Sequence, residues 1–333
     1  MKAVIINEFG GPEVLQVLDV EKPVPKGKEV LVKNVAAGVG RPDSMVRSGI
    51  YPFLGKQPPM LTIGNECAGY VEAVGEDVTK VKVGTPVWVV HNPGYGCCAE
   101  YTCVDESYVT PLPAAMNPEN AVGLLNYFIG WSMLHEAGRG TDGKTLYILG
   151  GAGGVGTCLI KMALADGWEV ISAADTEEKC DHLRRLGTTH VFNCAKQDEK
   201  EAVMQFTNGR GVDLVYDQWV GEKLYPEFDL LADFGTVVIY NWLEGEPKEN
   251  FYKPLIDHAT KCIGLRIYSS HLYDTDPARM QNLQQQVFGL LLSGKVNMDE
   301  YFYGDFTLDD ARQAHEILDA QTAYGKIVLK VRS

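Results

Sequence analysis

The sequence lacks the features that mark several common protein classes. Its eight cysteines include no Cys-x-x-Cys pair, and eight in 333 residues are too few for a disulfide scaffold. No stretch approaches the ~20 apolar residues of a membrane span, and the first residues do not resemble a signal peptide. With 44 acidic and 30 basic residues, the net charge of −14 argues against a nucleic-acid partner. We therefore expect a cytoplasmic protein that binds neither nucleic acid nor a membrane.

Length and hydrophobic pattern predict two domains. A chain of 333 residues exceeds the length at which a single core usually stops growing. Residues 1 to about 115 hold short β-branched runs separated by glycine, proline and acidic turns. The pattern changes from about 117, where a helix is predicted to begin, and strand and helix patterns then alternate, which predicts βαβ units on a parallel sheet. The expected fold is α/β, with a β-rich domain of residues 1–119 and 265–333 and a doubly wound parallel-sheet domain of residues 120–264.

Local signals predict where individual helices begin. Asn117 before Pro118 is a good cap and first-turn pair, and the pattern after it predicts one helix that runs to Gly138. Thr307 and Asp310 have the spacing of a capping box. The seven histidines show no metal-ligand spacing. Those on predicted helices are interpreted as surface or boundary residues: His135, His182 and His315.

Residues 149–158, LGGAGGVGTC, contain five glycines between a predicted strand and a predicted helix. Gly151, Gly153 and Gly156 fit the pattern G-x-G-x-x-G, in which the glycines permit a tight turn, close approach of a pyrophosphate and helix–strand packing. The N–H groups at the following helix start, which includes Gly154 and Val155, would face the phosphates. A glycine-rich turn without a ligand is the alternative. Because no G-x-x-x-x-G-K-[ST] motif is present, an NTPase is disfavoured.

These features resemble one known family over essentially the whole chain. The stretches GVGRPDSMVRSGIYP, IGNECAGYVEAVGEDV, GGAGGVG, VDLVYDQWVG and YGKIVL occur in the order seen in the medium-chain dehydrogenase/reductase superfamily. The sequence is most similar to its zinc-free quinone oxidoreductase (zeta-crystallin-like) branch. The resemblance implies a GroES-like substrate domain, a Rossmann NAD(P)-binding domain and a homodimer.

The resemblance also indicates that the catalytic zinc of other superfamily members is absent. At the three positions where zinc alcohol dehydrogenases have Cys, His and Cys, this chain has Gly40, Asn65 and Leu125. Glycine and leucine offer no ligating side-chain atom, and asparagine is a poor zinc ligand. We therefore expect no zinc. Without this Lewis acid, the expected acceptor carries its own electron sink.

Further site residues follow from the resemblance. Tyr51 matches a tyrosine of the family's active site, and it is the candidate for orienting the acceptor or donating a proton. Arg41, Asn241 and Lys326 match positions near the cofactor. A surface role is the alternative for Tyr51 and Arg41.

The residues after the glycine loop give opposing indications of the cofactor preference. Lys179 matches a lysine that meets the 2′-phosphate of NADPH, Thr176 can hydrogen-bond it, and Asn193 lies nearby. Asp175, about 19 residues beyond Gly156, lies near where an acidic residue holds the ribose 2′-hydroxyl in NAD enzymes. We expect NADPH to be preferred, with NADH possible.

The sequence therefore predicts a zinc-independent NAD(P)H oxidoreductase. Its small-molecule substrate would be a quinone or the activated C=C of an α,β-unsaturated carbonyl compound. An alcohol dehydrogenase and a cofactor-binding, crystallin-like protein without activity are the alternatives.

Overall fold

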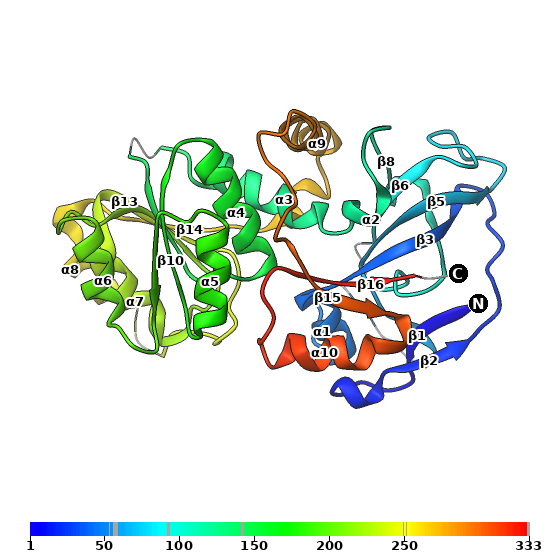
Figure 1. Cartoon of the computed structure of the whole chain (residues 1–333), viewed down its shortest axis with the longest axis horizontal. Helices are drawn as coiled ribbons and strands as arrows, with labels where there is room; N and C mark the ends of the chain where they lie inside the picture. Colours follow the sequence, from blue (N-terminus) through cyan, green and yellow to red (C-terminus); the bar gives the residue numbers. More distant parts are fainter. Residues whose placement is uncertain are drawn as a thin grey trace. The chain divides into compact units, whose positions relative to one another are not determined.

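The computed structural model describes residues 1–52, 54–55, 59–91, 94–140, 143–248, 250 and 252–331. Its chain divides into two compact units, Met1–Leu125 with Phe302–Ser333, and Asn126–Tyr301 (Figure 1). The predicted α/β architecture is confirmed, because one unit is β-rich and the other is built on a parallel sheet. We describe each unit by itself.

The first unit contains two sheets. A three-stranded sheet has the order β2-β1-β4, and a seven-stranded sheet has the order β15-β16-β3-β5-β6-β8, with β7 paired to β3. All pairs in the larger sheet are antiparallel except β15 with β16. The strands are β1 (Lys2–Ile6), β2 (Gln16–Asp19), β3 (Glu29–Val39), β4 (Leu61–Thr62), β5 (Glu66–Val74), β6 (Pro86–Val90), β7 (Tyr101–Asp105), β8 (Val109–Pro111), β15 (Phe302–Thr307) and β16 (Lys326–Lys330). The helices are α1 (Arg41–Arg47), α2 (Pro118–Ala121) and α10 (Ala311–Asp319).

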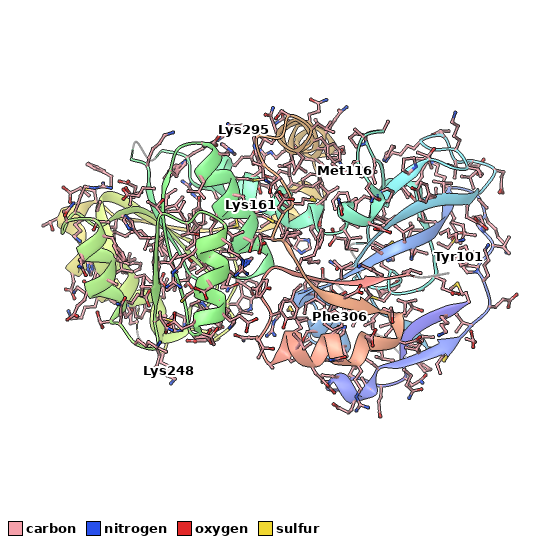
Figure 2. All side chains as sticks on the ribbon, in the orientation of Figure 1. Tyr101, Met116, Lys161, Lys248, Lys295 and Phe306 are labelled. Atoms are coloured by element: carbon pink, nitrogen blue, oxygen red, sulfur yellow. The ribbon has the colours of Figure 1, made fainter. Side chains whose placement is uncertain are left out.

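Side chains of both sheets and of α10 fill one core in this unit. It includes Val32, Cys67, Cys97 and Cys98, all fully buried, and Phe306, which Figure 2 labels. Burial raises the pKa of the Cys97 and Cys98 thiols well above the ordinary value, so both stay neutral. Cysteine here packs as a small apolar side chain.

The second unit is built on a six-stranded parallel sheet of order β11-β10-β9-β12-β13-β14. The strands are β9 (Thr145–Ile148), β10 (Glu169–Ala174), β11 (His190–Asn193), β12 (Val212–Asp217), β13 (Leu231–Ile239) and β14 (Gly264–Ile267). The helices are α3 (Leu124–Ser132), which begins in the first unit, α4 (Gly154–Ala165), α5 (Glu177–Arg185), α6 (Glu199–Phe206), α7 (Leu224–Leu230), α8 (Tyr252–Asp257) and α9 (Pro277–Leu292). The strand order reverses between β9 and β12, and ligands of such sheets bind at the carboxyl ends of the strands beside that reversal.

The division of the chain near its end differs from the sequence-based boundary. Residues 265–301 lie in the parallel-sheet unit. There β14 pairs with β13, and α9 packs on α3 through Phe288 and Phe128, whose ring centroids lie 5.9 Å apart. The return to the β-rich unit comes at Phe302.

The two predicted caps are confirmed, but the single helix predicted after Asn117 is wrong. Asn117 accepts the N–H of Glu119, and Thr307 and Asp310 form a capping box. The helix breaks at Gly123, whose φ of 110° lies outside the helical region. The Gly123 N–H donates to Oε1 of Glu66 at 2.7 Å instead of to a carbonyl one turn back. A π-helical turn, Met133–Ala137, then ends at Gly138.

Candidate cofactor site and buried charge site

The glycine loop connects β9 to α4 at the carboxyl edge of the parallel sheet. Gly156 has no room for a side chain, because a Cβ there would lie 2.5 Å from the Gly150 carbonyl oxygen and from the Gly151 Cα. A Cβ on Gly151 would lie 2.1 Å from the Ser172 hydroxyl oxygen. Helix α4 thus packs directly on the strand, as the third glycine of the motif requires.

Gly153 differs from its neighbours because the space in front of it is open. A Cβ on Gly153 would meet nothing closer than the Gly150 carbonyl oxygen at 3.4 Å, and its φ of −76° suits any residue. The fold itself does not require glycine at this position. Gly153 is the N-cap of α4, followed by Gly154 and Val155, so N–H groups and the positive helix end stand over that space. The loop therefore fits a pyrophosphate.

The residues expected near the ribose lie where β10 and β11 end. Asp175 follows β10, and its carboxylate pairs with Lys179 at 2.8 Å. Thr176 caps α5 by accepting the N–H of Lys179. Asn193, the last residue of β11, is nearly buried. Its amide donates to Glu177, and its oxygen accepts the N–H of Ala195. The structure brings the four predicted residues to one edge of the sheet, where Asn193 holds a neighbouring carboxylate.

The segment after β13 carries Asn241. Its side-chain oxygen accepts the N–H of Trp242 at 2.9 Å, and the Tyr240 hydroxyl donates to the Leu149 carbonyl at 3.3 Å. Leu149 opens the glycine-rich stretch, so this hydrogen bond connects the end of β13 to the glycine loop. Trp242 is 59% exposed. The unit thus presents an aromatic side chain to solvent at this edge.

In the first unit, Lys326 takes part in a buried charge site with two carboxylates. Its ammonium lies 3.1 Å from Glu66 Oε2, an ion pair without hydrogen-bond geometry. Glu66 Oε1 accepts the indole N–H of Trp88 at 2.9 Å and the Gly123 N–H at 2.7 Å. Asp43 is fully buried, and burial raises its pKa to about 6 against the opposing effect of Lys326. Sequence reasoning placed Lys326 near the cofactor but did not foresee this partner.

The three positions compared with zinc ligands converge on this buried charge site. Asp43 accepts the N–H of Gly40 at 2.7 Å and of Asn65 at 3.0 Å, and the Leu125 N–H points at Glu66 Oε1 from 3.4 Å. A Cβ on Gly40 would lie 3.4 Å from the Lys326 ammonium. The positions contribute backbone groups and no ligating side chain except an asparagine amide. A lysine ammonium supplies the local positive charge.

Tyr51 and Arg41 also lie in the first unit. Tyr51 is half-buried against its core, with ring carbons near the Cβ position of Gly94. Arg41 is the first residue of α1, where its side chain makes no hydrogen bond or ion pair within the described part of the chain. Its guanidinium is free to bind an anion.

A buried acidic group in the parallel-sheet unit carried no sequence signal. Glu227 on α7 is 1% exposed, and neither carboxylate oxygen has a hydrogen-bond partner among the described residues. Burial, reinforced by Asp217 and Glu199, raises its pKa well above the ordinary value despite nearby Lys223. Burial likewise raises the pKa of Asp217, at the end of β12, to about 6. Burial and its acidic neighbours therefore favour the protonated form of Glu227.

Two of the three helical histidines are buried, so the sequence-based interpretation of them was wrong. His315 packs against the buried Arg47, whose Nη1 lies 3.0 Å from His315 Nδ1. Because arginine only donates, Nδ1 accepts and the ring proton sits on Nε2. Burial and Arg47 lower the pKa of His315 to about 3. His182 is also fully buried, within hydrogen-bond distance of Thr157.

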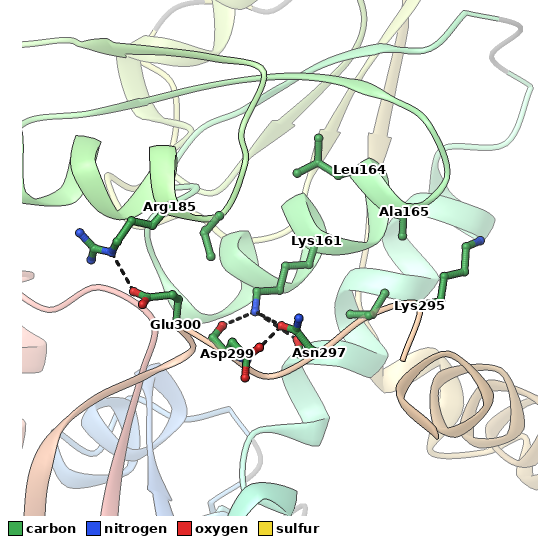
Figure 3. A pocket seen from close by; sticks show the side chains of 10 residues that line it. Lys161, Leu164, Ala165, Arg185, Lys295, Asn297, Asp299 and Glu300 are labelled. Atoms are coloured by element: carbon green, nitrogen blue, oxygen red, sulfur yellow. Dashed lines mark hydrogen bonds and ion pairs between the residues drawn. The ribbon is translucent and has the colours of Figure 1, made fainter. Parts of the chain in front are cut away.

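A groove of about 480 Å³ lies at the other ends of α4 and α5, away from the glycine loop (Figure 3). Its three basic side chains are engaged by the protein itself. Lys161 donates to Asn297, Arg185 pairs with Glu300 at 2.8 Å, and Lys295 pairs with Asp166 at 2.8 Å. This groove therefore matches the phosphates of a dinucleotide less well than the glycine loop does.

Neither a metal cluster nor a membrane span occurs in the part of the chain that the structure describes. No three His, Cys, Asp or Glu side chains there are arranged to hold a metal ion. No helix within the same residues is both long and apolar enough to cross a bilayer.

The fold and these sites together define a two-domain dehydrogenase or reductase. Residues 26–114 match the family model described as "Alcohol dehydrogenase GroES-like domain", and residues 154–283 match the one described as "Zinc-binding dehydrogenase". A quinone oxidoreductase from Mus musculus is 30% identical over 340 residues, which cover 99% of this chain and 97% of the relative. The chain belongs to the quinone oxidoreductase branch of the medium-chain dehydrogenase/reductase superfamily, which confirms the resemblance drawn from the sequence.

Solved structures show the same fold. The Escherichia coli quinone oxidoreductase, complexed with NADPH, aligns with a TM-score of 0.86 at 25% identity, over 99% of this chain and 100% of the other. A quinone oxidoreductase from Pseudomonas syringae pv. Tomato gives 0.85 at 28% identity, over 99% of both chains. A 2-haloacrylate reductase gives 0.82 at 25% identity and covers both chains completely.

Proposed function

We propose that this protein is a zinc-independent NAD(P)H oxidoreductase that transfers a hydride to a quinone or to the activated C=C of an enone or enoyl compound. The observation that carries the proposal is the donor set around Asp43, Glu66 and Lys326. Two of the three ligand positions, Gly40 and Leu125, offer only backbone, and the Lys326 ammonium lies 3.4 Å from the Cβ position of Gly40. The two carboxylates are engaged by backbone N–H groups, the Trp88 indole and the Lys326 ammonium, so this set does not offer the three thiolate, imidazole or carboxylate ligands of a catalytic zinc.

The substrate class follows from the missing electrophile. Reduction of a simple ketone benefits from a Lewis acid on its oxygen, whereas a quinone or an enone delocalises the incoming charge onto its own carbonyl. The names of two structural relatives support this class, since one is a quinone oxidoreductase and the other a 2-haloacrylate reductase. A quinone is an activated ring, and a 2-haloacrylate is an activated alkene.

The glycine loop fits the cofactor. The open space over Gly153 and the N–H groups at the start of α4 would hold the pyrophosphate. When bound, NAD(P)H supplies the hydride. In this proposal Arg41 binds a phosphate oxygen, Asn241 contributes to the nicotinamide end, and Tyr51 orients the acceptor or holds the proton that it receives.

The test of the proposal is a turnover assay with purified protein. Consumption of NADPH is followed with a panel of quinones, enones and simple aldehydes, with and without a strong chelator, and the metal content is measured in parallel. Turnover of quinones or enones that survives chelation supports the proposal. A zinc content near one per chain with chelator-sensitive aldehyde reduction would indicate an alcohol dehydrogenase. Cofactor binding without any turnover would indicate a crystallin-like protein.

A homodimer is part of the proposal. β14 is an edge strand of the parallel sheet, and its apolar residues Leu265 and Ile267 are 37% and 75% exposed. An edge strand with apolar side chains is a template for pairing with a second copy. Light scattering after size exclusion measures the mass, and Ile267→Lys should shift a dimer towards monomer.

A further inference from the structure

Four charged side chains pair with one another where β10 and β11 end. Lys179 Nζ lies 2.8 Å from Asp175 Oδ1, and Lys196 Nζ lies 2.7 Å from Glu177 Oε1. Asn193 donates to the same Glu177 oxygen at 2.8 Å, which fixes that carboxylate in place. Two lysines and two carboxylates carry no net charge together. We call Asp175, Glu177, Lys179 and Lys196 the charged quartet.

The charged quartet lies where the adenosine ribose of a dinucleotide is expected. β10 is the neighbour of β9, which leads into the glycine loop, and the residues after this second strand meet the ribose 2′ position in such sheets. Asp175, Glu177 and Lys179 follow β10, whereas Lys196 follows β11. The quartet is therefore contributed by both strand ends that flank this position.

A 2′-phosphate and a 2′-hydroxyl would meet this quartet differently. The phosphate carries about −1.5 to −2 charges and binds best to cations that have no other partner. Both lysines of the quartet are already neutralised by their own carboxylates. A 2′-hydroxyl, in contrast, needs only an acceptor such as Asp175. The quartet thus favours the unphosphorylated ribose more than its two lysines alone would suggest.

Resting on the proposed NAD(P)H-dependent function, we propose that the charged quartet limits the preference for a 2′-phosphate and that Glu177, through Lys196, determines this specificity. The Glu177–Lys196 pair is solvent-exposed, with side chains 52% and 64% accessible. Exposed ion pairs are weak, so a phosphate can compete with Glu177 for the lysine. Removing the Glu177 charge should release Lys196 towards the phosphate while leaving its position in the fold intact.

The test measures binding of two adenine nucleotides that differ only in the 2′-phosphate. Isothermal titration calorimetry gives Kd values of 2′,5′-ADP and 5′-ADP for the wild type, Glu177→Gln, Lys196→Met and the double variant. Glu178→Gln is the matched control, because Glu178 is an exposed neighbour of Glu177 and its loss releases no lysine. Glu177→Gln should tighten 2′,5′-ADP binding about fivefold to tenfold and leave 5′-ADP within about twofold.

The double variant decides whether Lys196 carries the effect. Arg184 lies 3.8 Å from the other Glu177 oxygen, so a gain that persists in Glu177→Gln/Lys196→Met would overturn the role of Lys196. An equal gain in 2′,5′-ADP affinity in Glu178→Gln would show that any lost negative charge has this effect, and it would overturn the specific role of Glu177. If the wild type bound neither nucleotide, the proposed function itself would fail. If both nucleotides bound and the ratio of their Kd values were unchanged in Glu177→Gln, this inference would fail while the proposed function stood.

Discussion

The Lys326 ammonium lies 3.1 Å from Oε2 of Glu66, and the two side chains are only 7% and 0% exposed. A buried pair of this kind contributes little net stability by itself, but removal of one partner leaves an uncompensated charge in a medium of low dielectric constant. Here the consequence is larger than one pair, because Asp43 is buried beside it and its pKa depends on the same ammonium. The positive charge of Lys326 thus lowers the free-energy cost of burying the Glu66 and Asp43 carboxylates.

The first prediction is that Lys326→Met destabilises the β-rich unit by about 3–5 kcal/mol, the cost of breaking a buried pair. Equilibrium unfolding in urea, followed by tryptophan fluorescence, measures it. Lys330→Met is the control on the same strand, because its pair with Asp305 at 2.7 Å is exposed and should change stability by less than about 1 kcal/mol. Lys326→Met/Glu66→Gln should recover part of the loss. Equal small effects of the two lysine substitutions would show that the pair is solvated.

The second prediction separates two glycines of the same loop. Gly153→Val should weaken NADPH binding by at least about tenfold, or ~1.4 kcal/mol, with near-native stability, because its side chain would fill the open space in front of α4. Gly156→Ala should instead lower the melting temperature, because its Cβ would lie 2.5 Å from backbone atoms of Gly150 and Gly151. Cofactor fluorescence and thermal unfolding give both readouts. Unchanged affinity in folded Gly153→Val would make the loop a structural turn.

Features that depend on neighbouring residues could be predicted from the sequence, whereas features that depend on distant residues could not. The pattern of strand, glycines and helix is local, so it located the loop and α4, and the caps at Asn117 and Thr307 are equally local. The break at Gly123 was missed because it depends on Glu66, a carboxylate 57 residues earlier in the chain. The burial of His315 was missed for the same reason, since its partner Arg47 is 268 residues away.

Charge pairing was the least predictable part of the candidate site. Asp175 and Lys179 could be recognised as opposing determinants of cofactor choice, but the sequence did not show that they neutralise each other. Lys326 was assigned by resemblance to the cofactor, and the structure places its ammonium against Glu66. Such pairings depend on side-chain positions that several elements set together.

The third prediction concerns the pH dependence of stability and Glu227. Its pKa is raised in the folded protein, so the folded state keeps a proton that the unfolded state releases. The stability contributed by this group is complete below its unfolded pKa of about 4.5 and is lost as pH rises towards the folded value. Glu227→Gln should remove that loss, so its stability relative to the wild type should increase from pH 5 to pH 8.

Urea midpoints of both proteins at pH 5, 6, 7 and 8 check this expectation. Asp217 and Glu199 face Glu227 and titrate in both proteins, so the difference between the two curves isolates Glu227. Parallel curves would show that Glu227 is ionised in the folded protein or reaches solvent.

The fourth prediction concerns Tyr51. If its hydroxyl orients or protonates the acceptor, Tyr51→Phe should lower kcat/KM for enones by roughly 10- to 100-fold, because general acid catalysis contributes up to 10²–10⁴. Quinones should lose less, because their reduced oxygens can take protons from water. The phenylalanine ring keeps the packing against the core, so stability should change little. Equal, negligible losses of kcat/KM on both substrate classes would show that Tyr51 only lines the site.

The last prediction is the cofactor preference and its dependence on Asp175. We expect kcat/KM to be higher for NADPH than for NADH, since Lys179 is only 14% exposed and stays close to the strand end where a 2′-phosphate would lie. The margin should be small, because Asp175 already pairs with that lysine, and a carboxylate about 4 Å from the phosphate opposes it by up to ~4 kcal/mol at an effective dielectric constant of 20. The Asp175 side chain is 63% exposed, so screening and rotation away from the phosphate reduce this repulsion well below that limit.

Asp175→Gly should release Lys179, remove the acceptor for a 2′-hydroxyl and widen the gap in kcat/KM in favour of NADPH. Steady-state kinetics with both cofactors and one quinone measure the ratio, and repeating them at 0.05 and 0.5 M salt should narrow it if charge is responsible. A wild-type preference for NADH that Asp175→Gly reverses would show that this carboxylate, and not Lys179, governs the ribose end of the site.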